Sequence, residues 1–132
     1  MSTYVFSEPR GWSFDKLGHR GKLFTPGDTL ESTSHLIVEI NGQLPSWLRQ
    51  NECDFVYYVL RGRGRFLIED REEVCSRGDL VRVPKGSKFT YKGRRLRMLL
   101  TSTPPWWETQ EQVLEDSPTP RRDGKEARRA SR

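Results

Sequence analysis

Hydrophobic and polar side chains alternate along much of this chain with a period of two residues, as they do in strands that bury one face. The first clear case is the run HLIVEI, which starts at His35. In it Leu36, Val38 and Ile40 share one face, while His35 and Glu39 share the other. The pattern predicts a half-buried β-strand in this part of the chain.

Further runs of β-branched and aromatic residues follow, separated by turns that are rich in Gly, Pro and charged residues. The predicted strands lie at 54–60, 65–70, 79–84, 88–93 and 95–103. The dipeptide Asn41-Gly42 and the sequence RGRG at 61–64 supply two of the turns. Short strands with no helical stretch between them are typical of a sandwich or a closed barrel. The sequence therefore predicts an all-β fold.

A different pattern begins after the last of these strands. Pro104 and Pro105 end the sheet, because proline has no N–H to donate to a ladder. The sequence WWETQEQVLE at about 106–115 favours a short C-terminal helix. Residues 116–132 lack large apolar side chains, which predicts a disordered basic tail. We therefore expect one domain at 1–115, followed by the tail at 116–132.

The composition agrees with one small domain and limits the classes of function. A chain of 132 residues allows one modest core, to which four Trp, four Tyr and six Phe contribute large apolar surfaces. Much of the net charge of +5 lies in residues 116–132, which carry six basic and three acidic side chains. Contact with nucleic acid is therefore expected only through this tail, if at all. The sequence contains no apolar run of membrane-spanning length and no signal peptide, so we expect a cytoplasmic protein with no membrane partner.

The spacing of glycine and proline between 42 and 93 resembles the two sequence motifs of the cupin superfamily. Gly42 and Gly62 hold the glycine positions of the first motif, and Gly78, Pro84 and Gly86 match the second motif in register. The phrases DFVYYVLRGRGRF and RGDLVRVPKGSKFTYKG look like those of small single-domain bacterial cupins. The resemblance implies a cupin double-stranded β-helix, which is a jelly-roll barrel, with its core motifs at 42–93.

The positions that hold a metal in cupins hold other residues here. Cupin metal sites resemble a set of three histidines and one glutamate, whereas the corresponding positions of this chain are Leu48, Gln50, Phe55 and Phe89. Leucine and phenylalanine have no lone pair to donate, and the whole chain has only two histidines. Cys53 and Cys75 are too few for a structural zinc site and are expected to be reduced thiols. We therefore expect no bound metal and no other cofactor.

The family register and the strand alternation together predict which side chains face the barrel interior. Tyr57 and Tyr91 are expected there as candidate catalytic residues, because a buried hydroxyl needs a partner that a ligand or an ordered water supplies. The candidate ligand-binding residues around them are Gln50, Phe55, Phe89 and Met98. In the alternative interpretation, the aromatic side chains of this set only fill a core.

Two further candidates depend on which way the early strand faces. If the face with His35 and Glu39 points inward, these two side chains form a candidate acid–base pair. If it points outward, they are solvated, and the alternation alone favours this second arrangement. His19 lies between glycines and is expected in an exposed loop. Three basic residues are candidates for binding a carboxylate or phosphate at the barrel mouth, namely Lys22, Arg49 and Lys92.

Three functions are compatible with these residues. The first is a metal-independent cupin that binds a small organic ligand in an aromatic-lined barrel and acts on it as an isomerase, epimerase, cyclase or lyase. The second is a non-catalytic ligand-binding or accessory protein, and the third is a nucleic-acid-associated protein that acts through its basic tail. The resemblance to small cupins also implies a homodimer.

Overall fold

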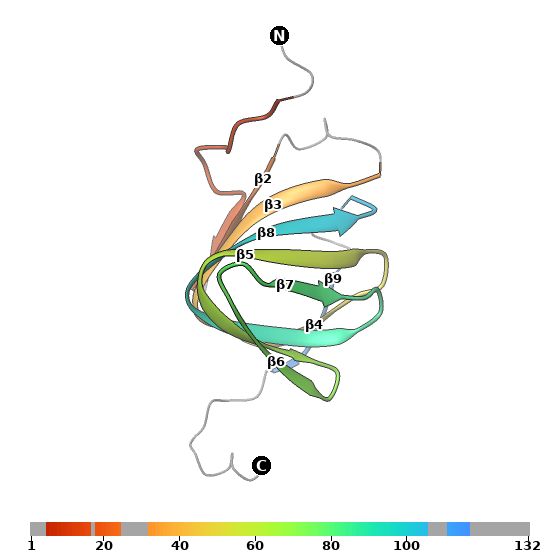
Figure 1. Ribbon diagram of the computed structural model, residues 1–132. Coiled ribbons are helices and arrows are strands. Elements are labelled where there is room, and N and C mark those ends of the chain that lie inside the picture. The colour runs from red at the N-terminus through yellow and green to blue at the C-terminus, as the bar shows by residue number, and fades with distance from the viewer. Residues whose placement is uncertain (1–4, 17, 25–31, 106–110, 117–132) are drawn as a thin grey trace.

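Residues 5–16, 18–24, 32–105 and 111–116 are described by the computed structural model of this protein (Figure 1). Every regular element in these ranges is a β-strand, so the all-β prediction is confirmed. The strands are β1 (Phe14–Lys16), β2 (His19–Leu23), β3 (Ser34–Gln43), β4 (Ser46–Gln50), β5 (Asp54–Ile68), β6 (Arg71–Ser76), β7 (Leu80–Val83), β8 (Lys88–Thr103) and β9 (Glu111–Asp116).

Two long strands, β5 and β8, organise the sheet. They pair with each other antiparallel from Asp54↔Thr103 at one end to Ile68↔Phe89 at the other. The remaining strands join in the order β1-β2-β3-β8-β4-β9, while β6 and β7 pair with β5. Because both long strands bend midway, the sheet curls around a common interior, as Figure 1 shows. The predicted jelly-roll barrel is thereby confirmed.

The bend is made by a close approach that only glycine permits. The register of β5 and β8 shifts between Val59 and Arg63, as it does at β-bulges. Gly62 lies at this shift with a φ of +82°, and a Cβ atom there would be 2.1 Å from the carbonyl oxygen of Arg95. Arg95 itself has a φ of 50°. The second glycine of the first cupin-like motif is therefore required by the backbone.

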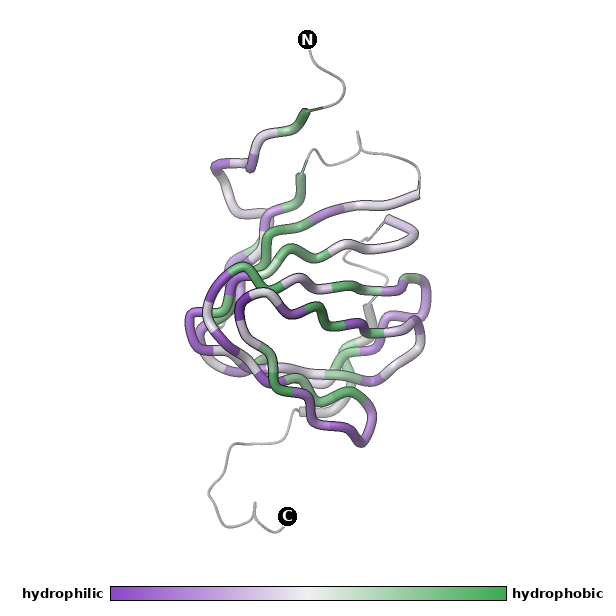
Figure 2. Tube along the Cα trace, in the orientation of Figure 1, coloured by the Kyte–Doolittle hydropathy of each residue, from purple (hydrophilic) through white to green (hydrophobic). Residues whose placement is uncertain are grey.

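The interior is lined mainly by the apolar faces of β3, β5, β7 and β8. Leu36, Val38 and Ile40 are at most 2% exposed and belong to the core cluster. In Figure 2 hydrophobic positions recur along the long strands, while hydrophilic positions gather at the bend and at the tip of the β5–β6 hairpin. The strand periodicity that the sequence predicts is thus the periodicity of the core.

The predicted C-terminal helix is wrong in the part of 106–115 that the structure describes. Residues Glu111–Asp116 form β9, which pairs antiparallel with β4 from Gln50↔Glu111 to Ser46↔Asp116. The edge of β4 supplies backbone partners that a short isolated helix does not have, so tertiary pairing outweighs local propensity. Residues 106–110, which include both indoles of the predicted helix, and the tail beyond 116 lie outside the described residues.

The role of Gly62 leads to a stability prediction. Gly62→Ala should lower the free energy of unfolding by about 2–4 kcal/mol, because the new methyl group meets backbone atoms that cannot move aside. Urea unfolding measures this loss. Gly78→Ala is the matched control, since Gly78 also has a positive φ (+93°) but no heavy atom within 4 Å of the added Cβ. It should cost only about 1 kcal/mol. Equal losses in the two variants would contradict the close approach.

Candidate functional site

The inward-facing residues of β5 and β8 meet inside the barrel. Tyr57 and Tyr91, the candidate catalytic tyrosines, are 2% and 3% exposed, and their ring centroids lie 5.6 Å apart. Three of the candidate ligand-binding residues, Phe55, Phe89 and Met98, belong to the same core cluster, each at most 1% exposed. The fourth, Gln50, is 2% exposed and lies at the end of β4. The structure therefore brings the two tyrosines together with Phe55, Phe89 and Met98.

A histidine joins this set. The Nε2 atom of His19 lies 3.1 Å from the phenolic oxygen of Tyr91, within hydrogen-bonding distance. His19 is half-buried in β2, opposite Ile40 of β3, so the expectation of an exposed loop residue is wrong. The signal that could have located it is the alternation of His19, Gly21 and Leu23 with Arg20 and Lys22 in the sequence.

The ring of Phe14 packs against His19, and Gly21 makes room for it. The ring of Phe14 on β1 lies 4.9 Å from that of His19, centroid to centroid. Phe14 pairs with Gly21, where a Cβ atom would lie 2.5 Å from Cζ of Phe14. Gly21 thus leaves room for the phenyl ring that packs against the imidazole.

Tyr91 is also fixed by packing. Its ring stacks on Phe66 with centroids 4.6 Å apart and an interplanar angle of 17°. On β8 it lies parallel to Phe89, at 6.4 Å and 2°. The predicted interior set did not include Phe66. The alternation within RFLIED nevertheless puts Phe66 and Ile68 on one face of the strand, and Arg65 and Leu67 on the other. Packing of this kind restricts the phenol of Tyr91 to the position next to His19.

Gln50, a candidate ligand-binding residue, forms hydrogen bonds within the chain through both its side chain and its backbone. Its side-chain oxygen accepts a hydrogen bond of 2.7 Å from the backbone N–H of Glu52, and its backbone oxygen accepts one of 2.8 Å from Gly86. The side chain thus stabilises the turn before β5, while the backbone ties β4 to the glycine of the second motif.

The candidate acid–base pair of His35 and Glu39 lies on the opposite face of the sheet. Leu36, Val38 and Ile40 point into the core, so His35 and Glu39 project from the outer face of β3. The structure does not bring them to Tyr57 or Tyr91. This is the outward arrangement that the alternation favours.

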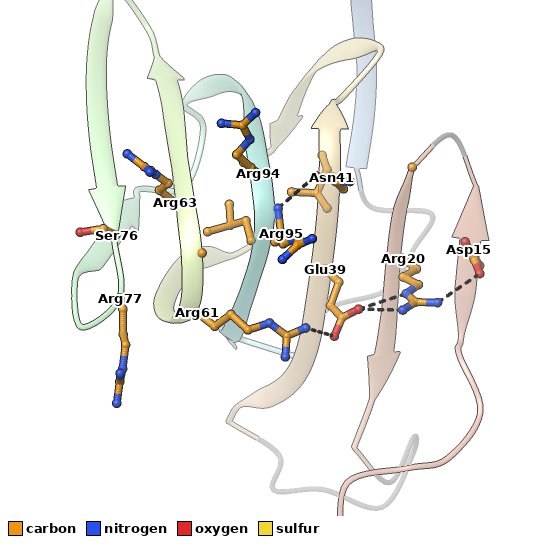
Figure 3. Close-up of a pocket in the computed structure, with 14 residues that line it drawn as sticks. Asp15, Arg20, Glu39, Asn41, Arg61, Arg63, Ser76, Arg77, Arg94 and Arg95 are labelled. Carbon is orange, nitrogen blue, oxygen red and sulfur yellow. Dashed lines mark hydrogen bonds and ion pairs between the residues drawn. The ribbon is translucent and has the colours of Figure 1, made fainter.

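Glu39 is the centre of an ion-pair cluster on that outer face. Arg20 approaches one carboxylate oxygen with Nη2 at 2.9 Å and Nε at 3.2 Å, and Arg61 approaches the other at 3.4 Å. Arg97 forms a further hydrogen bond to the same carboxylate. Figure 3 shows Glu39 between Arg20 and Arg61. Burial opposes the charge of Glu39, but the hydrogen bonds from Arg20 and Arg97 outweigh it and lower the pKa.

The same cluster attaches the N-terminal segment to the sheet. Glu8 accepts hydrogen bonds of 2.7 Å from Nη2 of Arg97 and forms an ion pair of 2.8 Å with Nζ of Lys22. These contacts with Lys22 and Arg97 lower the pKa of Glu8. The ring of Trp12 packs against two cations of the cluster. Its centroid lies 4.1 Å from the guanidinium carbon of Arg20 and 4.4 Å from Nζ of Lys22. Lys22, predicted as a ligand clamp, is therefore paired with Glu8.

The remaining predicted anion clamps are not gathered at one mouth. Arg49 lies on β4 between Lys88 of β8 and Gln112 of β9. Lys92 lies on β8 opposite Arg65 and is exposed. The structure thus places the three basic candidates on three different strands, without a common ligand position.

The donor set inside the barrel does not fit a metal ion. Leu48 and Phe89 face each other across β4 and β8, and Phe55 packs against Phe89 with ring centroids 6.2 Å apart. None of these side chains offers a lone pair. Within the described residues, no group of three or more His, Cys, Asp and Glu side chains is placed to hold a metal ion.

Known structures share this architecture. The nucleoside dehydratase Pac13 from Streptomyces is 21% identical, with 89% of this chain and 95% of that chain covered and a TM-score of 0.76. It has also been solved with uridine in variants that replace a tyrosine or a histidine. KdgF from Halomonas sp. is 16% identical over 75% of this chain and 89% of that one, with a TM-score of 0.63. Ectoine synthase from P. lautus is 12% identical over 85% and 87%, with a TM-score of 0.66.

These likenesses establish the fold. All three proteins are cupins, and this chain is a small cupin-like barrel. No protein-family model and no curated protein matches the chain. The described residues also include no helix with the length and apolar character needed to cross a membrane.

The Glu39 cluster leads to a prediction about pH. Glu39→Gln should lower the free energy of unfolding near neutral pH by about 2 kcal/mol, because the arginines lose the charge they share. Folding lowers the pKa of Glu39 below its ordinary value of 4.5, so the stabilisation is present above that value and is lost as the pH falls through the folded-state pKa. Urea unfolding of both proteins at several pH values should show the gap closing on acidification.

The matched control for this experiment is Glu73→Gln. Glu73 forms a 3.5 Å ion pair with Arg71 in which both side chains are about half exposed or more. Exposed pairs of this kind contribute little, so the control should match the wild type across the pH range. A gap for Glu39→Gln that stays constant into the acid range would contradict the account.

Proposed function

We propose that this protein is a metal-independent cupin that binds a small organic molecule at the mouth of the aromatic interior and transfers protons to and from it. The observation that carries the proposal is the 3.1 Å contact between Nε2 of His19 and the phenolic oxygen of Tyr91. Isomerases, epimerases, cyclases and lyases all need a base and an acid held near one another, and imidazole and phenol supply both.

Elimination of water illustrates how the pair would work. The imidazole of His19 takes a proton from carbon as the C=C bond forms, and the hydroxyl on the adjacent carbon leaves with a proton from the Tyr91 phenol. The resulting imidazolium then returns its proton to the phenolate across their hydrogen bond. Every proton is accounted for, and the only product besides the alkene is water. No step needs a metal ion.

The position of His19 supports access to a ligand. His19 is half-buried, whereas Tyr91 is only 3% exposed. The imidazole therefore carries the reactive pair toward the rim of the barrel. Phe14 beside it is half-buried and offers a ring against which a planar ligand can stack. Because Pac13 is a nucleoside dehydratase solved with uridine, uridine is the first ligand to test.

A second function is supported by the packing of the interior. The predicted ligand-binding aromatics contact one another, since Phe55 packs edge-on against both Tyr57 and Phe89. Rings that pack against one another can stabilise the barrel without taking part in a reaction, as they would in a non-catalytic binding or accessory protein. The nucleic-acid hypothesis depends on the tail, which lies outside the described residues. It stays a prediction, as do the homodimer and the cytoplasmic location.

Single substitutions distinguish catalysis from binding alone. Uridine binding is measured by calorimetry, and turnover is screened with nucleosides and hydroxy-carbonyl sugars. Mass spectrometry detects loss of water, and NMR detects uptake of solvent deuterium at carbon. Tyr91→Phe and His19→Gln should each lower kcat at least about 100-fold while changing ligand affinity far less. Activity should survive treatment with a chelator.

Tyr58→Phe is the matched control, because Tyr58 adjoins Tyr57 in sequence but is 43% exposed. It should leave both binding and turnover unchanged. If the wild type binds a ligand without turnover or deuterium uptake, the accessory function is favoured. Full activity in His19→Gln would overturn the proposed proton transfer.

A further inference from the structure

A hollow with strongly basic walls lies on the molecule away from the aromatic interior. Its volume is about 1160 Å³, and it is formed where β5 and β8 bend beside β3 and the β1–β2 turn. Its charged lining residues, all labelled in Figure 3, are Asp15, Arg20, Glu39, Arg61, Arg63, Arg77, Arg94 and Arg95. Six guanidinium groups thus face two carboxylates.

Three pairs of basic residues face each other across β5 and β8 near this hollow. The pairs in the register are Arg61↔Arg97, Arg63↔Arg94 and Arg65↔Lys92. Like charges directly opposite each other on adjacent strands destabilise a sheet. A nearby anion therefore stabilises each pair by compensating its positive charge.

Two of the three pairs obtain that anion from the chain itself. Glu39 contacts both Arg61 and Arg97, and Glu72 forms an ion pair with Arg65. The middle pair, Arg63 and Arg94, forms no ion pair with any carboxylate among the described residues. Arg77 and Arg95, which line the same hollow, form none with the described residues either. The uncompensated charge is thus confined to one part of the hollow.

The backbone holds these arginines in place. Arg95 has a positive φ of 50°, and its N–H donates a hydrogen bond of 3.1 Å to the side-chain oxygen of Asn41. Gly62 packs against the carbonyl groups of Arg94 and Arg95. Two consecutive side chains, Arg94 and Arg95, are therefore both exposed, although neighbours in a regular strand point to opposite faces. A non-glycine residue in this conformation is strained and persists where its surroundings fix it.

We propose that this hollow is a binding site for a small ligand that carries two or more phosphate groups. Guanidinium groups bind phosphate oxygens through paired hydrogen bonds, and several of them together match a polyphosphate better than a single carboxylate. The phosphate groups of the ligand supply the negative charge that no carboxylate of the described residues supplies to Arg63 and Arg94. This site is independent of the His19–Tyr91 pair and of any reaction inside the barrel.

The arrangement of charge favours a compact ligand over a nucleic-acid strand. Figure 3 shows Asp15 and Glu39 on the side of the hollow formed by β1 to β3, away from Arg63 and Arg77. An extended polyanion that continued across the sheet would meet these carboxylates. A short polyphosphate fits within the uncompensated part alone.

Calorimetry with inorganic tripolyphosphate and the full chain tests the proposal. The wild type should bind at physiological ionic strength and more tightly at lower salt. The double variant Arg63→Gln/Arg94→Gln should bind at least about tenfold more weakly. Its melting temperature without ligand should equal or exceed that of the wild type, because the opposed charges are gone. That melting curve also shows that the variant folds.

The matched control is Arg71→Gln/Arg82→Gln, which removes the same charge from exposed positions on β6 and β7 outside this hollow. It should retain wild-type affinity. Equal weakening in both double variants would mean general charge attraction and would overturn the site. So would undetectable tripolyphosphate binding, including the case in which a short oligothymidylate binds instead.

Discussion

The antiparallel pairing of β5 with β8 is the interaction on which the rest of this structure depends. These strands reach from Asp54↔Thr103 to Ile68↔Phe89, and every other strand except β1, β2 and β9 pairs directly with one of them. Their common bend requires Gly62 to pack against the backbone of Arg94 and Arg95. One side of the bent pair becomes the interior with Tyr57 and Tyr91. The other side becomes a basic surface, so both candidate sites follow from a single backbone constraint.

Polar side chains on the inner and outer faces of the sheet have different kinds of partner. Inside, the phenol of Tyr91 is buried and contacts the imidazole of His19, so its hydrogen-bonding capacity is directed at a neighbour that can exchange a proton. Outside, Glu39 and Glu8 compensate Arg20, Arg97 and Lys22, and they attach the N-terminal segment to the sheet. The side chains that could do chemistry are therefore separated from those that stabilise the fold.

The parts of the structure that could be predicted from sequence were those set by local pattern. Alternation located the apolar face of β3. The glycines at 61–64 predicted a turn between two strands, whereas β5 runs through them as one strand that bends at Gly62. Alternation around His19 was enough to place it in a strand, but not to predict its contact with Tyr91, which joins residues 72 positions apart. The C-terminal segment was predicted as a helix from its composition, but β9 forms because the edge of β4 is available to it. Contacts between distant strands, rather than local preference, decided both cases.

The central claim is that His19 and Tyr91 form a hydrogen-bonded pair able to exchange a proton, and nitrogen NMR of the histidine side chains tests it most directly. The chain has only two histidines, so a His35→Gln variant assigns both sets of signals. In Tyr91→Phe, the Nε2 signal of His19 should shift while the signals of His35 stay unchanged. An Nε2 signal of His19 that is the same in the wild type and in Tyr91→Phe would contradict the account.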